Sequence, residues 1–188
     1  MRTALIKHPR VMYLSVAYWF FSGLCMAAGG DAGTPERDAI ETLLRDSLMS
    51  WETGNEEQFT STAHPDMLFA FPGERTDIRG ALNVFRFWQE KFRDTKVYIH
   101  WILVDGNRFA VEYQFASTRV ATGERSAMGT VAIGEVRDGR ILLLKEYTDG
   151  RGSRMQERGE LPLDEGREPF PWPDVDRVNP WSQQTAAP

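Results

Sequence analysis

The chain has few of the residues on which metal-dependent and thiol-dependent enzymes rely. It contains one cysteine, Cys25, and three scattered histidines, His8, His64 and His100. A single cysteine forms no internal disulfide, and the histidines lack the spacing of a zinc site. No glycine-rich phosphate-binding loop is present either. We therefore predict no metal and no cofactor.

Positive charge is also scarce. The chain has 22 Lys and Arg against 27 Asp and Glu, which gives a net charge of −5. Three of the basic residues lie in the first 28 residues, where there is no acid, so the rest of the chain is more acidic still. Because phosphate binding needs a basic face, we expect no nucleic-acid partner.

A long uncharged run occurs once, near the N-terminus. Val11–Ala28 follows Arg2, Lys7 and Arg10 and ends in small residues. This order of basic, apolar and small residues is typical of a secretory signal. The run of about 18 residues is also long enough to span a bilayer. We assign residues 1–30 to a signal peptide, or alternatively to an N-terminal membrane anchor. The body would then be exported, periplasmic or secreted, or held at the inner membrane by this segment alone.

Residues 31–150 predict helices followed by a sheet. A first helix begins at Thr34-Pro35-Glu36 and stops at Gly54, a second begins after Asn55, and a third follows Gly80 and runs to about Phe92. Met67–Phe71 is predicted as a short strand. Alternating residues then predict strands over 96–104, 108–118, 126–137 and 140–148, separated by glycine-containing turns.

This order of elements predicts an α+β fold in which a curved antiparallel sheet wraps around helices. Residues 151–188 differ, because they hold six of the ten prolines and show little periodicity. We interpret them as an extended, Pro-rich C-terminal tail, with Phe170–Pro173 as a candidate for docking on the body.

One carboxylate lies on an apolar strand. Glu146 falls on the same face as Leu142 and Leu144. Burial of an ionised carboxylate costs free energy, so such a group either reaches water or has a raised pKa. Glu146 is therefore a candidate acid or base of a pocket; the alternative is a strand-end carboxylate that meets water or an arginine. Six Trp and eleven Phe supply either a core or an aromatic pocket wall.

Five short motifs together suggest a family. They are Trp51-x-x-Gly54-Asn55, Phe71-Pro72-Gly73, Ile78-Arg79-Gly80, Asp138-Gly139-Arg140-Ile141 and Glu146-Tyr147-x-Asp149. Over residues 35–150 the chain resembles the nuclear transport factor 2-like superfamily, and within it the SnoaL-like group and its limonene-epoxide-hydrolase relatives. The resemblance implies a cone-shaped sheet with an apolar pocket. Members include isomerases, dehydratases, cyclases, epoxide hydrolases and non-catalytic binders, so the fold alone does not fix the function.

The resemblance also assigns roles to residues. Glu146 matches the aspartate that activates water in the epoxide hydrolases, but Tyr113 and Phe115 stand where those enzymes have an Arg and an Asp. The steroid isomerases place a catalytic Asp where this chain has Phe71, and a Tyr near Ser47. Neither mechanism is therefore reproduced in full.

We predict Glu146 as a catalytic acid or base and Tyr113 as the residue that orients a ligand oxygen or Glu146; the alternative for Tyr113 is a half-buried sheet tyrosine. The predicted pocket walls are Trp51, Phe71, Trp88, Phe115 and Met128. The predicted function is that of a cofactor-independent isomerase, dehydratase, cyclase or hydrolase acting on a small hydrophobic molecule.

Two alternatives remain open. One is a non-catalytic domain that binds a small molecule or a protein, and the other is a membrane-tethered assembly factor that docks a partner through its tail. We also expect a homodimer through the outer sheet face, formed by Tyr98, Ile102, Val131 and Ile133.

Overall fold

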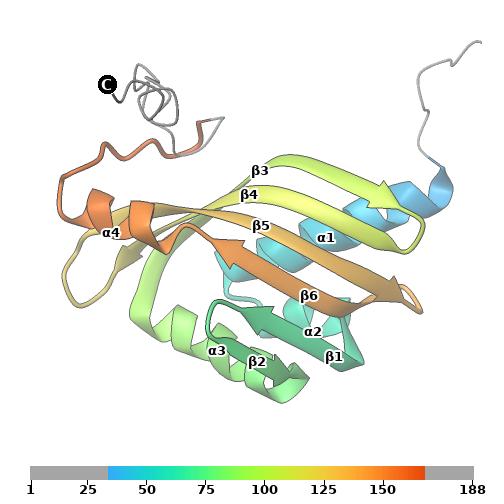
Figure 1. Cartoon of the computed structure of the whole chain (residues 1–188). Helices are drawn as coiled ribbons and strands as arrows, with labels where there is room; N and C mark the ends of the chain where they lie inside the picture. Colours follow the sequence, from blue (N-terminus) through green and yellow to red (C-terminus); the bar gives the residue numbers. More distant parts are fainter. Residues whose placement is uncertain (1–33, 168–188) are drawn as a thin grey trace, which may run out of the picture. The chain divides into compact units, whose positions relative to one another are not determined.

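The computed structural model describes residues 34–167 (Figure 1). The predicted leader, and the tail beyond residue 167, lie outside this range. Within it the chain forms four helices and one six-stranded sheet, which confirms the predicted α+β fold. No helix between residues 34 and 167 is both long and apolar enough to cross a membrane.

The first two helices begin and end where their capping residues predict. Helix α1 spans Pro35–Thr53, and the Thr34 hydroxyl accepts a hydrogen bond from the Arg37 amide. It ends at Gly54, which adopts the left-handed conformation that glycine favours. Helix α2 spans Glu56–Thr62, and the Asn55 side chain accepts from the Gln58 amide.

Helix α3 begins before Gly80, the residue that was predicted to precede it. It spans Ile78–Lys91, and Asp77 caps it by accepting from the Gly80 amide. The strand order in the sheet is β2-β1-β6-β5-β4-β3. The strands are β1 Ala63–Phe71, β2 Glu74–Asp77, β3 Phe92–Asp105, β4 Arg108–Arg119, β5 Arg125–Arg137 and β6 Arg140–Thr148. All pairings are antiparallel except that of β1 with β6, so the sheet is mixed.

The sheet has one face toward the helices, which we call the concave face, and an opposite, convex face. Helices α1, α2 and α3 lie on the same side of the sheet (Figure 1). Apolar residues of these helices pack against the concave face to form the core. Its members include Ile40, Leu44, Phe59, Phe85, Phe109, Val111 and Ile141.

A bulge in β3 overturns part of the predicted alternation. Ile99 pairs with Tyr113 but Trp101 pairs with Glu112, so His100 is an extra residue in β3. Beyond the bulge the faces exchange. Ile102 packs against the core, while the Trp101 side chain remains 41% exposed. The prediction that Ile102 lies on the outer face is therefore wrong.

The segment after β6 is helical at first, not extended as predicted. Helix α4 spans Gly150–Glu157, with Asp149 as its cap. The pairing of β5 with β6 begins only at Thr130, which leaves the start of β5 without a partner strand on that side. The Gln156 side chain accepts a hydrogen bond from the Ala127 amide at 2.7 Å. Helix α4 therefore takes the place of a strand along this edge, a long-range role that local periodicity does not reveal.

Residues 161–167, which we call the strap, continue onto the convex face. The fully buried Gln114 side chain donates to the Asp164 carbonyl at 2.9 Å and accepts from the Gly166 amide at 2.5 Å. Glu165 pairs with Arg125 at 2.5 Å and accepts from the Tyr98 hydroxyl at 2.9 Å. The strap is therefore fixed to β3, β4 and β5.

Candidate functional site

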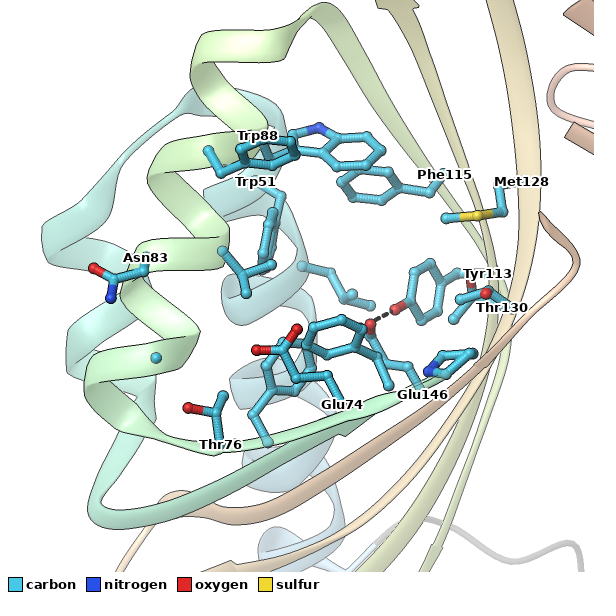
Figure 2. Close-up of a pocket in the computed structure, with 18 residues that line it drawn as sticks. Trp51, Glu74, Thr76, Asn83, Trp88, Tyr113, Phe115, Met128, Thr130 and Glu146 are labelled. Carbon is cyan, nitrogen blue, oxygen red and sulfur yellow. Dashed lines mark hydrogen bonds between the residues drawn. The ribbon is translucent and has the colours of Figure 1, made fainter. Parts of the chain in front are cut away.

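A large cavity opens between the concave face, helices α1 and α3, and the β1–β2 hairpin (Figure 2). Its volume is about 820 Å³, which is in the range of small-molecule pockets. All seven residues predicted for the site line it: Trp51, Phe71, Trp88, Tyr113, Phe115, Met128 and Glu146. They come from α1, β1, α3 and three adjacent strands, so the fold brings distant parts of the sequence together.

Strand register places the polar groups of the cavity. On the concave face, Tyr113 of β4, Thr130 of β5 and Thr148 of β6 form one row across the sheet. Glu146 lies in the next row, beside the small residue Ala132. The Tyr113 side chain reaches across the strands, and its hydroxyl donates a hydrogen bond to the Glu146 carboxyl at 2.6 Å (Figure 2).

Burial sets the protonation of this pair. Desolvation raises the pKa of Glu146 from 4.5 to about 7, although the hydrogen bond from Tyr113 acts in the opposite direction. Desolvation, followed by the nearby Glu146 charge, also raises the pKa of Tyr113 well above its ordinary value. Near pH 7 the phenol therefore keeps its proton, while Glu146 is present in both its acid and its base form.

Aromatic rings form the wall that faces this pair. Phe115 meets Trp88 edge-on at 4.7 Å between ring centroids and Trp51 at 6.0 Å. The Trp88 indole donates to the Thr95 hydroxyl at 3.2 Å, and Trp51 packs against Phe85 at 4.9 Å. These contacts hold the rings in place, and the cavity wall is therefore preformed and mostly apolar.

Eleven further residues line the cavity without having been predicted from the sequence. They are Leu48, Phe69, Pro72, Glu74, Thr76, Gly80, Asn83, Val84, Phe87, Thr130 and Thr148. Some had a readable signal: Thr130 lies two residues after Met128 on one strand and so shares its face. Glu74 and Thr76 could not be predicted in this way, because all four residues of β2 are polar and show no alternation of apolar and polar residues.

Other residues considered in the sequence do not line the cavity. His100 is in the bulge of β3, and His64 approaches Asp138 at 3.8 Å. The Asp149 carboxylate accepts from the Gly152 amide at 2.9 Å, and is therefore used in capping α4. Among residues 34–167, no three His, Cys, Asp or Glu side chains gather in a way that could hold a metal ion.

Comparison with solved structures supports this architecture. The chain aligns with the putative polyketide cyclase IdmH from Streptomyces antibioticus at 22% identity and a TM-score of 0.57, over 62% of this chain and 96% of IdmH. TsrD from Streptomyces laurentii aligns at 20% identity and a TM-score of 0.60, over 66% and 98% of the two chains. An LEH-like epoxide hydrolase from M. tuberculosis aligns at 21% identity and a TM-score of 0.59, over 66% and 93%.

At these identities the likeness shows that the chain shares the fold of these proteins. A search of curated proteins found no match. The family model described as the SnoaL-like domain matches residues 44–144, which is more than half of the chain and includes Trp51, Tyr113 and Thr130. The chain therefore belongs to the SnoaL-like domain family.

Proposed function

We propose that this protein is an exported, cofactor-independent acid/base enzyme that acts on a small hydrophobic molecule. The observation that carries the proposal is the Glu146 carboxyl, held by Tyr113 in a mostly apolar cavity with a pKa of about 7. A group with a pKa near the working pH accepts and returns protons efficiently. The polyketide cyclases and the epoxide hydrolase that share the fold lend the proposal support by analogy only.

The roles of the two residues follow from their protonation. Ionised Glu146 takes a proton from a carbon or an oxygen of the substrate, and protonated Glu146 returns it at a second atom. Tyr113 keeps its phenolic proton and directs the carboxyl through their hydrogen bond. Isomerisation, dehydration, cyclisation and hydrolysis all need such a transfer, and the proposal covers this class of reactions.

A non-catalytic binding domain is the second candidate. Tyr113 and Phe115 occupy the positions at which the epoxide hydrolases, on the resemblance described above, carry an Arg and an Asp. Among the described residues that line the cavity, only Glu74, Tyr113 and Glu146 are titratable. A cavity with so few ionisable groups is also suited to holding an apolar ligand unchanged.

Hydrogen–deuterium exchange separates the two candidates. 2-Tetralone, a bicyclic ketone with an acidic C–H group, is incubated with the full chain in D₂O at pD 7, and deuterium uptake is followed by NMR. We expect Glu146→Gln to slow the protein-dependent exchange by about a hundredfold or more. Glu74→Gln is the matched control and should retain it. Equal exchange by wild type and Glu146→Gln would contradict the role of Glu146, and binding without exchange would favour the second candidate.

The remaining proposals concern location and assembly. We propose that residues 1–30 direct export, as a cleaved signal or as the only membrane-associated segment; an intact Met1 in the mature protein would exclude cleavage. We also propose a homodimer through the convex face, with no nucleic-acid partner. The exposed apolar side chains at that face are Trp101, Leu103, Ile133 and Tyr147.

A further inference from the structure

A second, smaller pocket lies beside the main cavity, between helix α4 and strands β4 and β5, and we call it the α4 chamber. It shares Trp88, Phe115 and Met128 with the main cavity, so one layer of side chains divides the two pockets (Figure 2). Its volume of about 230 Å³ is below the usual range for a whole ligand. The chamber is therefore of a size to hold the end group of a ligand whose body lies in the main cavity.

Strand register explains why the two pockets adjoin. Phe115 of β4 pairs with Met128 of β5, and the next pair on the concave face is Ser117 with Ser126. Along these two strands the concave face thus changes from apolar, at the dividing layer, to polar, at the α4 chamber. The dividing layer is deformable, because the unbranched Met128 side chain has three rotatable bonds.

The two pockets carry charge of opposite sign. The described residues that line the main cavity include two carboxylates, Glu74 and Glu146, and no Lys, Arg or His. Those that line the α4 chamber include two guanidinium groups, Arg119 and Arg154, and one carboxylate, Glu157. The chamber therefore has a net positive charge, although the net charge of the chain is −5. An anionic group is favoured in the chamber and disfavoured in the main cavity.

Most polar groups of the α4 chamber already have partners. Arg119 pairs with Glu157 at 2.9 Å and lies over the Phe92 ring at 5.0 Å. The Ser153 hydroxyl donates to the Ser126 hydroxyl at 2.9 Å, and Ser126 donates to Glu157 at 3.3 Å. These contacts balance the charge of the Glu157 carboxylate and hold the walls of the chamber in place.

Two groups of the chamber are still available to a ligand. No ion pair or hydrogen bond joins the Arg154 side chain to another described residue, and its guanidinium lies beside Gly150, where a Cβ would be 3.2 Å from Nη1. The Ser117 hydroxyl also makes no hydrogen bond with a described residue, although Ser117 lines the chamber and is only 3% exposed. A guanidinium and a hydroxyl at one pocket are donors that suit a carboxylate.

We propose that the α4 chamber binds the carboxylate at the end of a hydrophobic ligand, with Arg154 as its ion-pair partner and Ser117 as a hydrogen-bond donor. This deepens the proposed function and rests on it, since the apolar body of the ligand occupies the main cavity. Tyr113 and Ser117 are four residues apart on β4, which corresponds to about 13 Å along a strand. The substrate class is therefore an elongated hydrophobic carboxylic acid, whose charged end lies away from Glu146.

Ligands of two lengths test the proposal. 8-Phenyloctanoate and 4-phenylbutyrate, each paired with its neutral primary amide, are titrated by calorimetry into the full chain. We expect 8-phenyloctanoate to bind about tenfold more tightly than its amide. 4-Phenylbutyrate should bind no better than its amide, because its carboxylate does not reach the chamber when the ring is in the main cavity.

Substitutions at the chamber should remove the preference for the long acid. Arg154→Gln and Ser117→Ala are each expected to reduce the ratio of acid to amide affinity about fivefold, with amide binding unchanged. Arg151→Gln is the matched control, because it removes the same charge from an exposed position of α4 that does not line the chamber. An unchanged ratio in Arg154→Gln or Ser117→Ala, an equal loss in Arg151→Gln, or a wild type that binds the long acid no better than its amide would overturn the proposal.

The outcomes remain separable from those of the proposed function. If the long acid is preferred through Arg154 but 2-tetralone does not exchange deuterium, the catalytic role of Glu146 fails and the role of the α4 chamber stands. If exchange depends on Glu146 but the acids and amides bind alike, the reverse holds.

Discussion

The two faces of the sheet depart from the usual distribution of polar and apolar residues in opposite directions. The concave face, which should be apolar, encloses the Glu146 carboxyl. The convex face, which should be polar, exposes Trp101 and Leu103, the latter to 59%. Each departure costs the isolated domain free energy. Such departures are expected where a molecule binds, and here they separate a candidate ligand site from a candidate protein interface.

The convex face itself divides into two halves. At one end Gln114, Ala116 and Ala127 are buried, and the strap covers Gln114 through two hydrogen bonds. At the other end Ile133 is 39% and Tyr147 is 60% exposed, and no described residue covers them. The strap therefore covers one half of the convex face and leaves apolar side chains of the other half exposed.

The largest effect is expected on the open half of the convex face. Trp101→Ser combined with Leu103→Ser should weaken self-association at least about a hundredfold, since loss of a buried apolar anchor typically costs about 2 kcal/mol. Light scattering after gel filtration measures the mass, and Val120→Ser, at a 53% exposed turn residue, is the control. A monomeric wild type would remove the basis for this interface.

A smaller effect is expected on the covered half. Gln114→Leu leaves the Asp164 carbonyl and the Gly166 amide without their partner, so unfolding should require about 3 kcal/mol less free energy. Chemical denaturation measures this loss, and trypsin should cleave after Arg158 and Arg167 more rapidly. Tyr98→Phe removes one hydrogen bond to Glu165 and should lower the free energy of unfolding by less than Gln114→Leu does. An unchanged unfolding midpoint for Gln114→Leu would show that the strap does not contribute to stability.

An effect of similar size concerns the concave face and depends on pH. The pKa of Glu146 is raised in the folded state, so the folded protein binds this proton more tightly than the unfolded chain. The contribution of Glu146 to the stability of the folded protein is therefore greatest below about pH 4.5 and declines as the pH rises to about 7. The free energy of unfolding of Glu146→Gln should exceed that of wild type by about 3 kcal/mol at pH 8.5, with the difference closing toward pH 4.5. A difference that does not change with pH would contradict the raised pKa.

Much of the architecture could be predicted from local sequence. The caps at Thr34 and Asn55 and the stop at Gly54 determine the first two helices through contacts within a few residues. The turn at Asp138-Gly139 also follows the sequence, since both residues have positive φ and suit a tight hairpin. Signals of this kind need no knowledge of the rest of the fold.

The rest depends on contacts between distant segments. The bulge at His100 is visible only in the register of β3 against β4. Helix α4 forms beside an edge of β5 that β6 leaves open, which no property of residues 150–157 indicates. Thr130 could be placed on the face of Met128, but its position beside Tyr113 follows only from the register of β4 against β5.

Because His100 is an extra residue in β3, the apolar side chains before and after it lie on opposite faces of the sheet. Before it, Val97 and Ile99 face the interior, and after it Trp101 and Leu103 face solvent. Substitutions at the last two positions can therefore change the exposed convex face without disturbing the core, whereas substitutions at Val97 and Ile99 change the packing against the core. Deletion of His100 would restore regular alternation along β3. It would turn the indole of Trp101 inward and displace Ile102 from the core.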